Sequence, residues 1–315
     1  MGDLRLFFAT DIHGSERCFR KFLNAGSFYG ADVLVMGGDM TGKMLLPVVA
    51  LADGRYATTI SGRERVVDAD GLPALKAMIA NGGFYAHECS PDELAALRDD
   101  PAAVQALFRS LMTSTIERWL ALAAERLNGR VCLMAPGNDD PAFVDALLDG
   151  SDVVVNPEGR VTALPGGFEL ISCGTSNPTP WDTPRELPED ALAALITESA
   201  SRLSRPERAI FNLHVPPRDT PIDQAVLLDG ELRPVLESGS PVIGGVGSSA
   251  VRDAIERFQP MLGLHGHIHE SRGEAKIGRT VSLNPGSEYG EGVLRGVLVT
   301  LSEKKGLRGW QFLAG

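Results

Sequence analysis

Seven residues of types that bind metal ions occur in five separate parts of the sequence. They are Asp11, His13, Asp39, Asn138, His214, His267 and His269. Each part follows an apolar run typical of a buried strand, at residues 4–9, 33–36, 131–135, 209–213 and 261–264. Because open α/β folds bring the carboxyl ends of parallel strands to one edge, we expect these side chains to converge. Together they offer enough oxygen and nitrogen atoms for two metal ions.

The spacing within two of the parts supports this expectation. Asp11 and His13 are two residues apart, and so are His267 and His269. Alternate residues leaving a strand point to the same side, so each pair can reach a single ion. Carboxylate oxygens combined with imidazole nitrogens suit zinc, manganese and iron better than calcium. The sequence alone does not choose among these metals.

The strand-like runs alternate with segments of helical periodicity, which is typical of α/β architecture. Residues 15–26 are expected to form the first helix, with Ser15 as its cap. Residues 56–60 and 65–68 flank Ser61-Gly62 and predict a hairpin. A helical stripe containing Trp119 ends near Gly129 and is expected to pack on the main body.

The order of the motifs resembles that of the calcineurin-like metallophosphoesterases, and especially their small stand-alone prokaryotic members. The matching blocks are Asp11-x-His13, Gly37-Gly38-Asp39, Gly137-Asn138, His214 and Gly266-His267-x-His269. They run from residue 11 to residue 269, so the resemblance covers most of the chain. It implies a four-layer α-β-β-α sandwich of two mixed sheets flanked by helices. The second and third blocks are closer together in that family, so residues 43–128 are expected to be a mainly helical insertion in a single domain spanning 1–315.

The resemblance also implies roles for the seven residues. Asp11, His13 and His269 would hold one metal, Asn138, His214 and His267 the other, and Asp39 would bridge them. The implied reaction is phosphoester hydrolysis by a hydroxide that bridges the metals, with Asn138 and His214 beside the phosphate. His265 has no place in the family pattern and is expected to support the site. His87, within the insertion, is expected to be structural or to face solvent.

Asp139 departs from the family pattern. Many of the resembled phosphatases have histidine after the Gly-Asn pair, where it protonates the leaving group. An ionised aspartate is a poor proton donor, so Asp139, as a catalytic candidate, favours a phosphodiesterase over a phosphomonoesterase. A cap or supporting role ahead of Pro141 is the alternative for Asp139. A phosphomonoesterase, a nucleotide pyrophosphatase and a weakly catalytic scaffold that keeps the fold are the alternative functions.

The composition of the chain limits which classes of binding partner are expected. Asp and Glu number 41 against 30 Lys and Arg, so the net charge is -11 and a nucleic-acid backbone or an anionic membrane is not expected as a bulk partner. A small phosphate ester, possibly a nucleotide, is the expected substrate. No signal-peptide pattern or membrane-length apolar run is present, and the four cysteines lack metal-site or disulfide spacing. We therefore expect a cytoplasmic protein, and the sequence leaves its oligomeric state open.

Two long connections are poor in core residues. Residues 174–190 are rich in proline, and residues 215–247 follow His214. Long loops in a compact domain are often functional, although a plain connection is about as common a reading. In the first loop, Asn177 and Trp181 are expected near the mouth of the metal pocket, where an aromatic face could stack on a nucleobase. The alternative is that Trp181 anchors the loop to the body.

Overall fold

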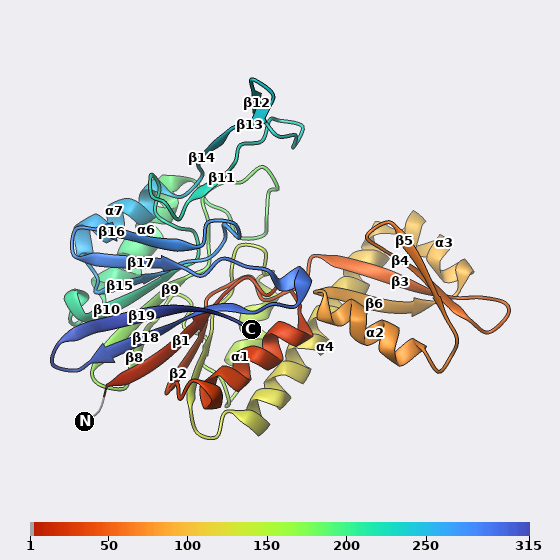
Figure 1. Cartoon of the computed structure of the whole chain (residues 1–315), viewed down its shortest axis with the longest axis horizontal. Coiled ribbons are helices and arrows are strands. Elements are labelled where there is room, and N and C mark those ends of the chain that lie inside the picture. The colour runs from red at the N-terminus through yellow and green to blue at the C-terminus, as the bar shows by residue number, and fades with distance from the viewer. Residues whose placement is uncertain (1–2) are drawn as a thin grey trace.

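The computed structural model describes residues 3–315, and its centre consists of two stacked mixed sheets (Figure 1). The first sheet has the order β19 (Gly306–Ala314), β18 (Arg295–Ser302), β1 (Leu4–Ala9), β2 (Val33–Met36) and β7 (Val131–Met134). The second has the order β16 (Gly273–Ile277), β17 (Thr280–Asn284), β15 (Leu262–Leu264), β10 (Ala209–Leu213), β9 (Phe168–Cys173) and β8 (Val161–Leu164). Strands β1, β2 and β7 are parallel to one another, as are β9, β10, β15 and β17.

Alternation along the strands divides the core into layers. In β1, Leu6 and Phe8 join the core between the two sheets, whereas Phe7 joins the core beneath the helices. Helices α1 (Glu16–Phe28), α4 (Pro101–Arg126) and α5 (Phe143–Asp149) cover the outer face of the first sheet. Helices α6 (Glu189–Ser201) and α7 (Ser249–Phe258) cover the second. The four-layer α-β-β-α sandwich expected from the motif order is therefore confirmed.

Helix α1 begins as expected. The Ser15 side chain accepts a hydrogen bond from the Cys18 backbone N–H and caps the helix. The helix continues two residues beyond the expected end, to Phe28, where the Tyr29 N–H still donates to the Ala25 carbonyl. This helix directly follows the Asp11-x-His13 loop and fixes where that loop leaves the sheet.

The segment between β2 and β7 projects from the sandwich (Figure 1). Its helices are α2 (Leu72–Asn81), α3 (Pro91–Asp99) and the first part of α4. Beside them lies a sheet of order β5 (Arg63–Val67), β4 (Tyr56–Ile60), β3 (Met44–Ala50) and β6 (Phe84–Cys89). The predicted hairpin is β4–β5, and Ser61 and Gly62 both have positive φ, as a tight hairpin turn requires. The pairing of β3 with β6 was not anticipated from the sequence.

Helix α4 joins this projection to the sandwich. It packs against α3 in the projection and against α1 and α5 in the sandwich. Trp119, in its second half, is only 1% exposed and stacks on Phe19 at a centroid distance of 4.2 Å. The expected packing of this helix on the main body is confirmed.

The connection after β10 forms a second projection (Figure 1). It contains two short antiparallel pairs, β11 (Gln224–Val226) with β14 (Ile243–Gly245) and β12 (Leu236–Glu237) with β13 (Ser240–Pro241). Both projections begin at carboxyl ends of parallel strands, so they leave the sheets from the edge that carries the candidate ligands. Among residues 3–315, no helix is both long enough and apolar enough to cross a membrane.

Candidate dinuclear metal centre

The seven candidate residues lie in loops that follow β1, β2, β7, β10 and β15. The loops are locked together by backbone hydrogen bonds, among them His13 N–H to the Asp39 carbonyl at 3.0 Å and Asp11 N–H to the Gly38 carbonyl at 3.0 Å. The His267 N–H also donates to Asp11 Oδ1 at 3.0 Å. These bonds connect loops from both sheets, so the site lies where the two sheet edges meet.

Backbone strain is concentrated in these loops. Four of the seven candidates have left-handed backbone conformations: Asp11 (φ 54°), His13 (φ 39°), Asp39 (φ 50°) and His267 (φ 66°). Non-glycine residues rarely adopt such values, and they persist where the surroundings hold them for function. The neighbouring glycines are needed for close approach. A Cβ at Gly137 would lie 2.2 Å from Asp39 Oδ1, and one at Gly38 would lie 2.3 Å from His214 Nδ1.

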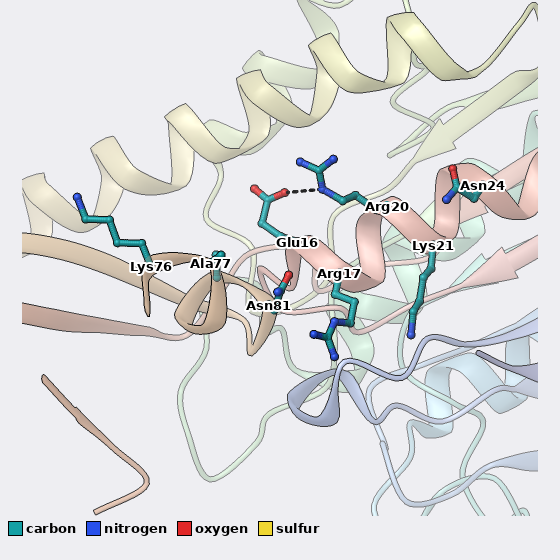
Figure 2. Close-up of a pocket in the computed structure, with 9 residues that line it drawn as sticks. Glu16, Arg17, Arg20, Lys21, Asn24, Lys76, Ala77 and Asn81 are labelled. Atoms are coloured by element: carbon teal, nitrogen blue, oxygen red, sulfur yellow. Dashed lines mark ion pairs between the residues drawn. The ribbon is translucent and has the colours of Figure 1, made fainter. Parts of the chain in front are cut away.

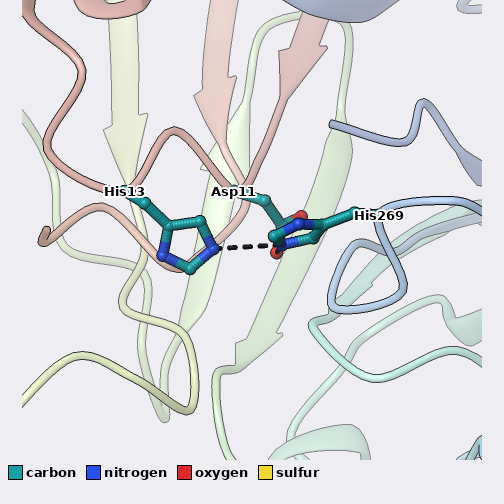
Figure 3. A group of neighbouring side chains, drawn as sticks. All are labelled: Asp11, His13 and His269. Atoms are coloured by element: carbon teal, nitrogen blue, oxygen red, sulfur yellow. Dashed lines mark hydrogen bonds and ion pairs between the residues drawn. The ribbon is translucent and has the colours of Figure 1, made fainter. Parts of the chain in front are cut away.

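Asp11, His13 and His269 form one cluster (Figure 3). His13 Nε2 and His269 Nε2 face each other at 3.0 Å, and His269 Nε2 lies 3.4 Å from Asp11 Oδ1. Burial lowers the pKa of His13 to about 3, so its ring is neutral and offers a lone pair. Burial also disfavours the charged form of His269, but the hydrogen bond and charge of Asp11 outweigh it and raise the pKa of His269.

Asp39, His214 and His267 form a second cluster, with Asn138 beside it. Asn138 Oδ1 lies 2.7 Å from His267 Nδ1, and His214 Nε2 lies 3.4 Å from Asp39 Oδ2. The same Asp39 oxygen is 3.7 Å from His13 Nε2 in the first cluster. Asp39 therefore stands between the two clusters, in the position expected of a bridging ligand.

Two features of the donors fit metal ions. First, His214 is fully buried and neither of its ring nitrogens has a hydrogen-bond partner, nor does His13 Nδ1. Buried polar atoms are normally satisfied, so these nitrogens are expected to ligate something. Second, Asp11 and Asp39 are buried, and within residues 3–315 only histidines lie within ion-pair distance of them. Buried carboxylates need positive charge, which two cations would supply.

The charge on His214 follows from the same surroundings. Burial disfavours its cation, but the charge of Asp39, whose Oδ2 lies 3.4 Å from His214 Nε2, and the charge of Asp11 outweigh it and raise the pKa of His214 to about 9. A metal ion in this cluster would take over that positive charge and displace the proton. His267, by contrast, has its pKa lowered to about 4, chiefly by burial, and is neutral.

Asp139 lies next to both clusters. Its N–H donates to Asp39 Oδ1 at 2.9 Å, its Oδ2 is 3.8 Å from His13 Nδ1, and Lys43 Nζ lies 2.5 Å from the same Oδ2. Burial and the charge of Asp39 raise the pKa of Asp139 to about 6, against the opposing effect of Lys43. Asp139 does not cap the next helix, because α5 begins at Phe143 without a side-chain cap.

Asp140 has a different environment from its neighbour. It is fully buried, and its carboxylate accepts hydrogen bonds from the backbone N–H groups of Met40, Thr41 and Gly137 and from the Thr41 hydroxyl. Asp140 thus fastens the loop after β7 to the loop after β2. It does not face the metal clusters.

The other two histidines have the roles expected for them. His265 is buried, with Nδ1 2.7 Å from the Leu213 carbonyl and Nε2 3.2 Å from the Ser282 hydroxyl, so both nitrogens have partners. It supports the strands beneath the site. His87 lies in the projection after β2 and pairs with Glu93 at 2.9 Å.

Sequence reasoning missed three residues that adjoin the clusters. Lys43 contacts Asp139, the Thr183 hydroxyl accepts from Asn138 Nδ2 at 2.9 Å, and the Tyr289 ring lies 4.7 Å from the His13 ring. Each comes from a segment outside the ligand motifs. The signal in the sequence was their closeness to the motifs: Lys43 is four residues after Asp39, and Tyr289 follows the Asn-Pro-Gly-Ser stretch.

A hollow of about 600 Å³ between α1 and α2 is separate from the clusters (Figure 2). Four basic side chains line it: Arg17, Arg20, Lys21 and Lys76. Arg20 pairs with Glu16, Lys21 donates to the Gly292 and Gly315 carbonyls, and Lys76 pairs with Glu88, whereas Arg17 has no hydrogen bond or ion pair within residues 3–315. None of the seven candidate ligands lines this hollow.

Comparison with known proteins gives a distant sequence relative. No family model matches the chain. The uncharacterized protein MJ1162 of Methanocaldococcus jannaschii is 31% identical over 157 residues, which cover 49% of this chain and 62% of that protein. The chain thus matches less than two thirds of the length of this relative.

Solved structures resemble the whole chain. One crystal structure has a TM-score of 0.58 at 15% identity, covering 99% of this chain and 98% of that one. A dimetal phosphatase from Danio rerio has a TM-score of 0.42 at 9% identity, with 100% and 99% coverage. An archaeal phosphodiesterase has 0.38 at 9% identity, with 99% and 100% coverage. The last two scores are too low to carry a functional argument. The first likeness shows that this chain shares its fold with that solved structure over nearly the full length of both.

Proposed function

We propose that this chain is a two-metal phosphoester hydrolase and, more specifically, a phosphodiesterase. The observation that carries the proposal is Asp39 Oδ2, which lies 3.7 Å from His13 Nε2 and 3.4 Å from His214 Nε2. One buried carboxylate oxygen thus lies within 4 Å of a histidine nitrogen in each of the two clusters. A scaffold without turnover has no use for buried histidine nitrogens left without hydrogen bonds.

The proposed ligands of one ion are Asp11, His13 and His269. Those of the other are Asn138, His214 and His267, with Asp39 shared. The donor types suit manganese, iron or zinc. When bound, two such ions would neutralise charge on a phosphate ester and lower the pKa of an attacking water.

The chain itself orients these groups. Asn138 keeps its amide oxygen toward His267 because its amide nitrogen donates to the Thr183 hydroxyl. That arrangement supports the proposal that Asn138 and His214 lie beside the bound phosphate. By holding these donors in a fixed relation, the loops would orient a bound phosphate for attack, and orientation raises the rate more than tight binding alone.

Asp139 supports the choice of a diester. It carries no imidazole that could protonate a leaving alkoxide, and its carboxylate lies 3.8 Å from His13 Nδ1 and forms an ion pair with Lys43. A diester carries one negative charge where a monoester carries up to two, so a diester meets less repulsion from Asp139. A phosphomonoesterase or a nucleotide pyrophosphatase remains the alternative enzyme.

The domain organisation is also a proposal. We infer a single metallophosphoesterase domain over 1–315 into which residues 43–128 are inserted. The inserted part has a small core of its own, Val48, Leu75 and Ile79. It still contacts the site, because the Tyr85 hydroxyl accepts from the Gly42 N–H at 2.9 Å. The expected cytoplasmic location stays a prediction.

The test is a comparison of substrates with the manganese-loaded and the metal-free protein. We expect bis-nitrophenyl phosphate to be hydrolysed faster than nitrophenyl phosphate, and neither to be hydrolysed after chelation. Turnover that survives chelation would contradict the two-metal proposal. Preference for the monoester would leave a metal-dependent hydrolase but reject the diesterase.

A further inference from the structure

The loop 174–187 is tightly built although it has little regular structure. The Glu186 carboxylate accepts from the Thr179 N–H at 2.8 Å, the Thr179 hydroxyl at 2.5 Å, the Thr183 N–H at 2.9 Å and the Thr183 hydroxyl at 2.6 Å. Four hydrogen bonds to one carboxylate hold residues 179–186 in a single shape. No apolar packing is needed to keep this shape.

The same loop is fastened to the metal centre. The Thr183 hydroxyl accepts from Asn138 Nδ2 at 2.9 Å, and the Arg185 N–H donates to the Asn138 carbonyl at 3.1 Å. The Arg185 side chain donates from Nε to the Asp140 carbonyl at 2.6 Å and pairs with Asp145 at 2.5 Å. The position of this loop is therefore fixed relative to Asn138, a proposed metal ligand.

Trp181 lies inside this rigid loop, yet its side chain has no place in the core. It is 61% exposed. Within residues 3–315, its ring pairs with no other aromatic ring and no cation, whereas Trp119 stacks on Phe19 and Trp310 donates to Glu274. Asp182, which follows, has φ 50°, so the chain turns sharply between Trp181 and Thr183. Backbone outliers of this kind occur often at ligand-binding loops.

The backbone that carries Trp181 is also close to a residue next to the metal centre. Trp181 and Thr183 are two residues apart, so their Cα atoms are separated by at most about 7 Å. Thr183 in turn contacts Asn138 directly. The alternative role, anchoring the loop, is already filled by Glu186 and Arg185. These contacts do not explain why the flat Trp181 indole is exposed to solvent on a rigid loop.

We propose that Trp181 is a stacking surface for the nucleobase of a nucleotide whose phosphate occupies the metal centre. This inference rests on the phosphoesterase function proposed above and names the substrate class as nucleotidyl esters. Stacking on an aromatic side chain tolerates every base, since each base has a flat face. Stacking adds affinity without a contact to one particular base. It also needs no basic groove, which would be unexpected in a chain with a net charge of -11.

The test compares adenosine 5′-monophosphate with ribose 5-phosphate, which lacks only the base. Their dissociation constants are measured by calorimetry with the manganese-loaded protein. Stacking on one aromatic ring should make the nucleotide bind about 5- to 150-fold tighter. In Trp181→Ala this ratio should fall to near one while ribose 5-phosphate binds as before. Trp181→Phe should keep part of the preference.

Phe28→Ala is the matched control, because Phe28 is 81% exposed on α1, away from the loop. It should leave the ratio unchanged. Equal affinities of the two ligands for the wild-type protein would overturn the proposal. So would a Trp181→Ala protein in which both ligands weaken equally, since the indole would then only shape the loop. If neither ligand binds, the phosphate site proposed above fails, and the stacking proposal fails with it.

Discussion

Lys43 Nζ lies 2.5 Å from Asp139 Oδ2, so the carboxylate at the entrance to the metal clusters carries its own cation. Lys43 is half-exposed, whereas Asp139 is mostly covered. The pair joins the start of the inserted segment to the loop after β7. It gives the inserted segment a direct contact with the site and keeps the Asp139 carboxylate paired with a cation.

Asp139→His should therefore change which esters are cleaved. A nitrophenolate departs unaided, but a poorer leaving group needs a proton donor. Replacing the carboxylate also removes repulsion against a doubly charged monoester. We expect the ratio of kcat/KM for bis-nitrophenyl phosphate over nitrophenyl phosphate to fall several-fold in the variant. An unchanged ratio with both metals retained would show that Asp139 does not set specificity.

Asn138→Ala and His214→Ala should lose activity without unfolding the protein. Loss of a ligand or of a group that orients phosphate costs on the order of 100-fold in turnover. His265→Ala is the matched control, because His265 is equally buried but bonds only to Leu213 and Ser282. It should lower the melting temperature yet retain metal. A His214→Ala protein with wild-type turnover would remove His214 from the site.

Asp140→Ala should lower the free energy of unfolding more than alanine substitutions at more exposed positions nearby. The substitution leaves the buried N–H groups of Met40, Thr41 and Gly137 without their acceptor. Each unsatisfied buried donor costs about 1–3 kcal/mol, so we expect a loss of roughly 3 kcal/mol or more. Urea denaturation measures it, with Asp145→Ala as the comparison. A change below about 1 kcal/mol would mean that Asp140 does not hold the two loops together.

Glu158 should make stability depend on pH. Burial raises the pKa of Glu158 from 4.5 to about 7, although the Gly174 N–H donates to both of its oxygens. The folded protein then binds more protons than the unfolded chain between these values. Stability contributed by the protonated form is therefore full below about pH 4.5 and is lost as the pH rises through about 7.

Glu158→Gln should flatten this dependence, because the amide keeps an acceptor for Gly174 and does not ionise. The measurement is the free energy of unfolding of both proteins at pH 5 and pH 8. We expect the wild type to lose more stability than the variant between these two values. Parallel curves would show that Glu158 is ionised in the folded protein throughout.

The sequence pointed to the candidate ligands but not to their neighbours, and the reason is physical. Asp11 and Asp39 can be identified from the sequence because each follows a buried strand. The geometry of parallel sheets then brings the two residues together. Lys43, Thr183 and Tyr289 approach the site through loops. The paths of these loops depend on long-range hydrogen bonds, such as that from Asn138 to Thr183 and that from the Gly42 N–H to Tyr85. No local pattern encodes such paths.

The inserted segment illustrates the same limit. The β4–β5 hairpin was predictable because Ser61-Gly62 is a local turn signal. Strand β3 contains Pro47 and pairs in parallel with β6, almost forty residues later, so neither its composition nor its spacing marks it as a central strand. The pairing is decided by the small core around Val48, Leu75 and Ile79.

The central claim is that two metal ions share Asp39, and metal counting tests it most directly. Protein stripped by chelation, reconstituted in turn with manganese, iron and zinc, and freed of excess metal should carry two ions per chain with at least one of these metals. Asp39→Asn should carry at least one ion fewer and lose most activity, since an amide is a weaker ligand for two cations. One ion or fewer per wild-type chain with all three metals would contradict the account.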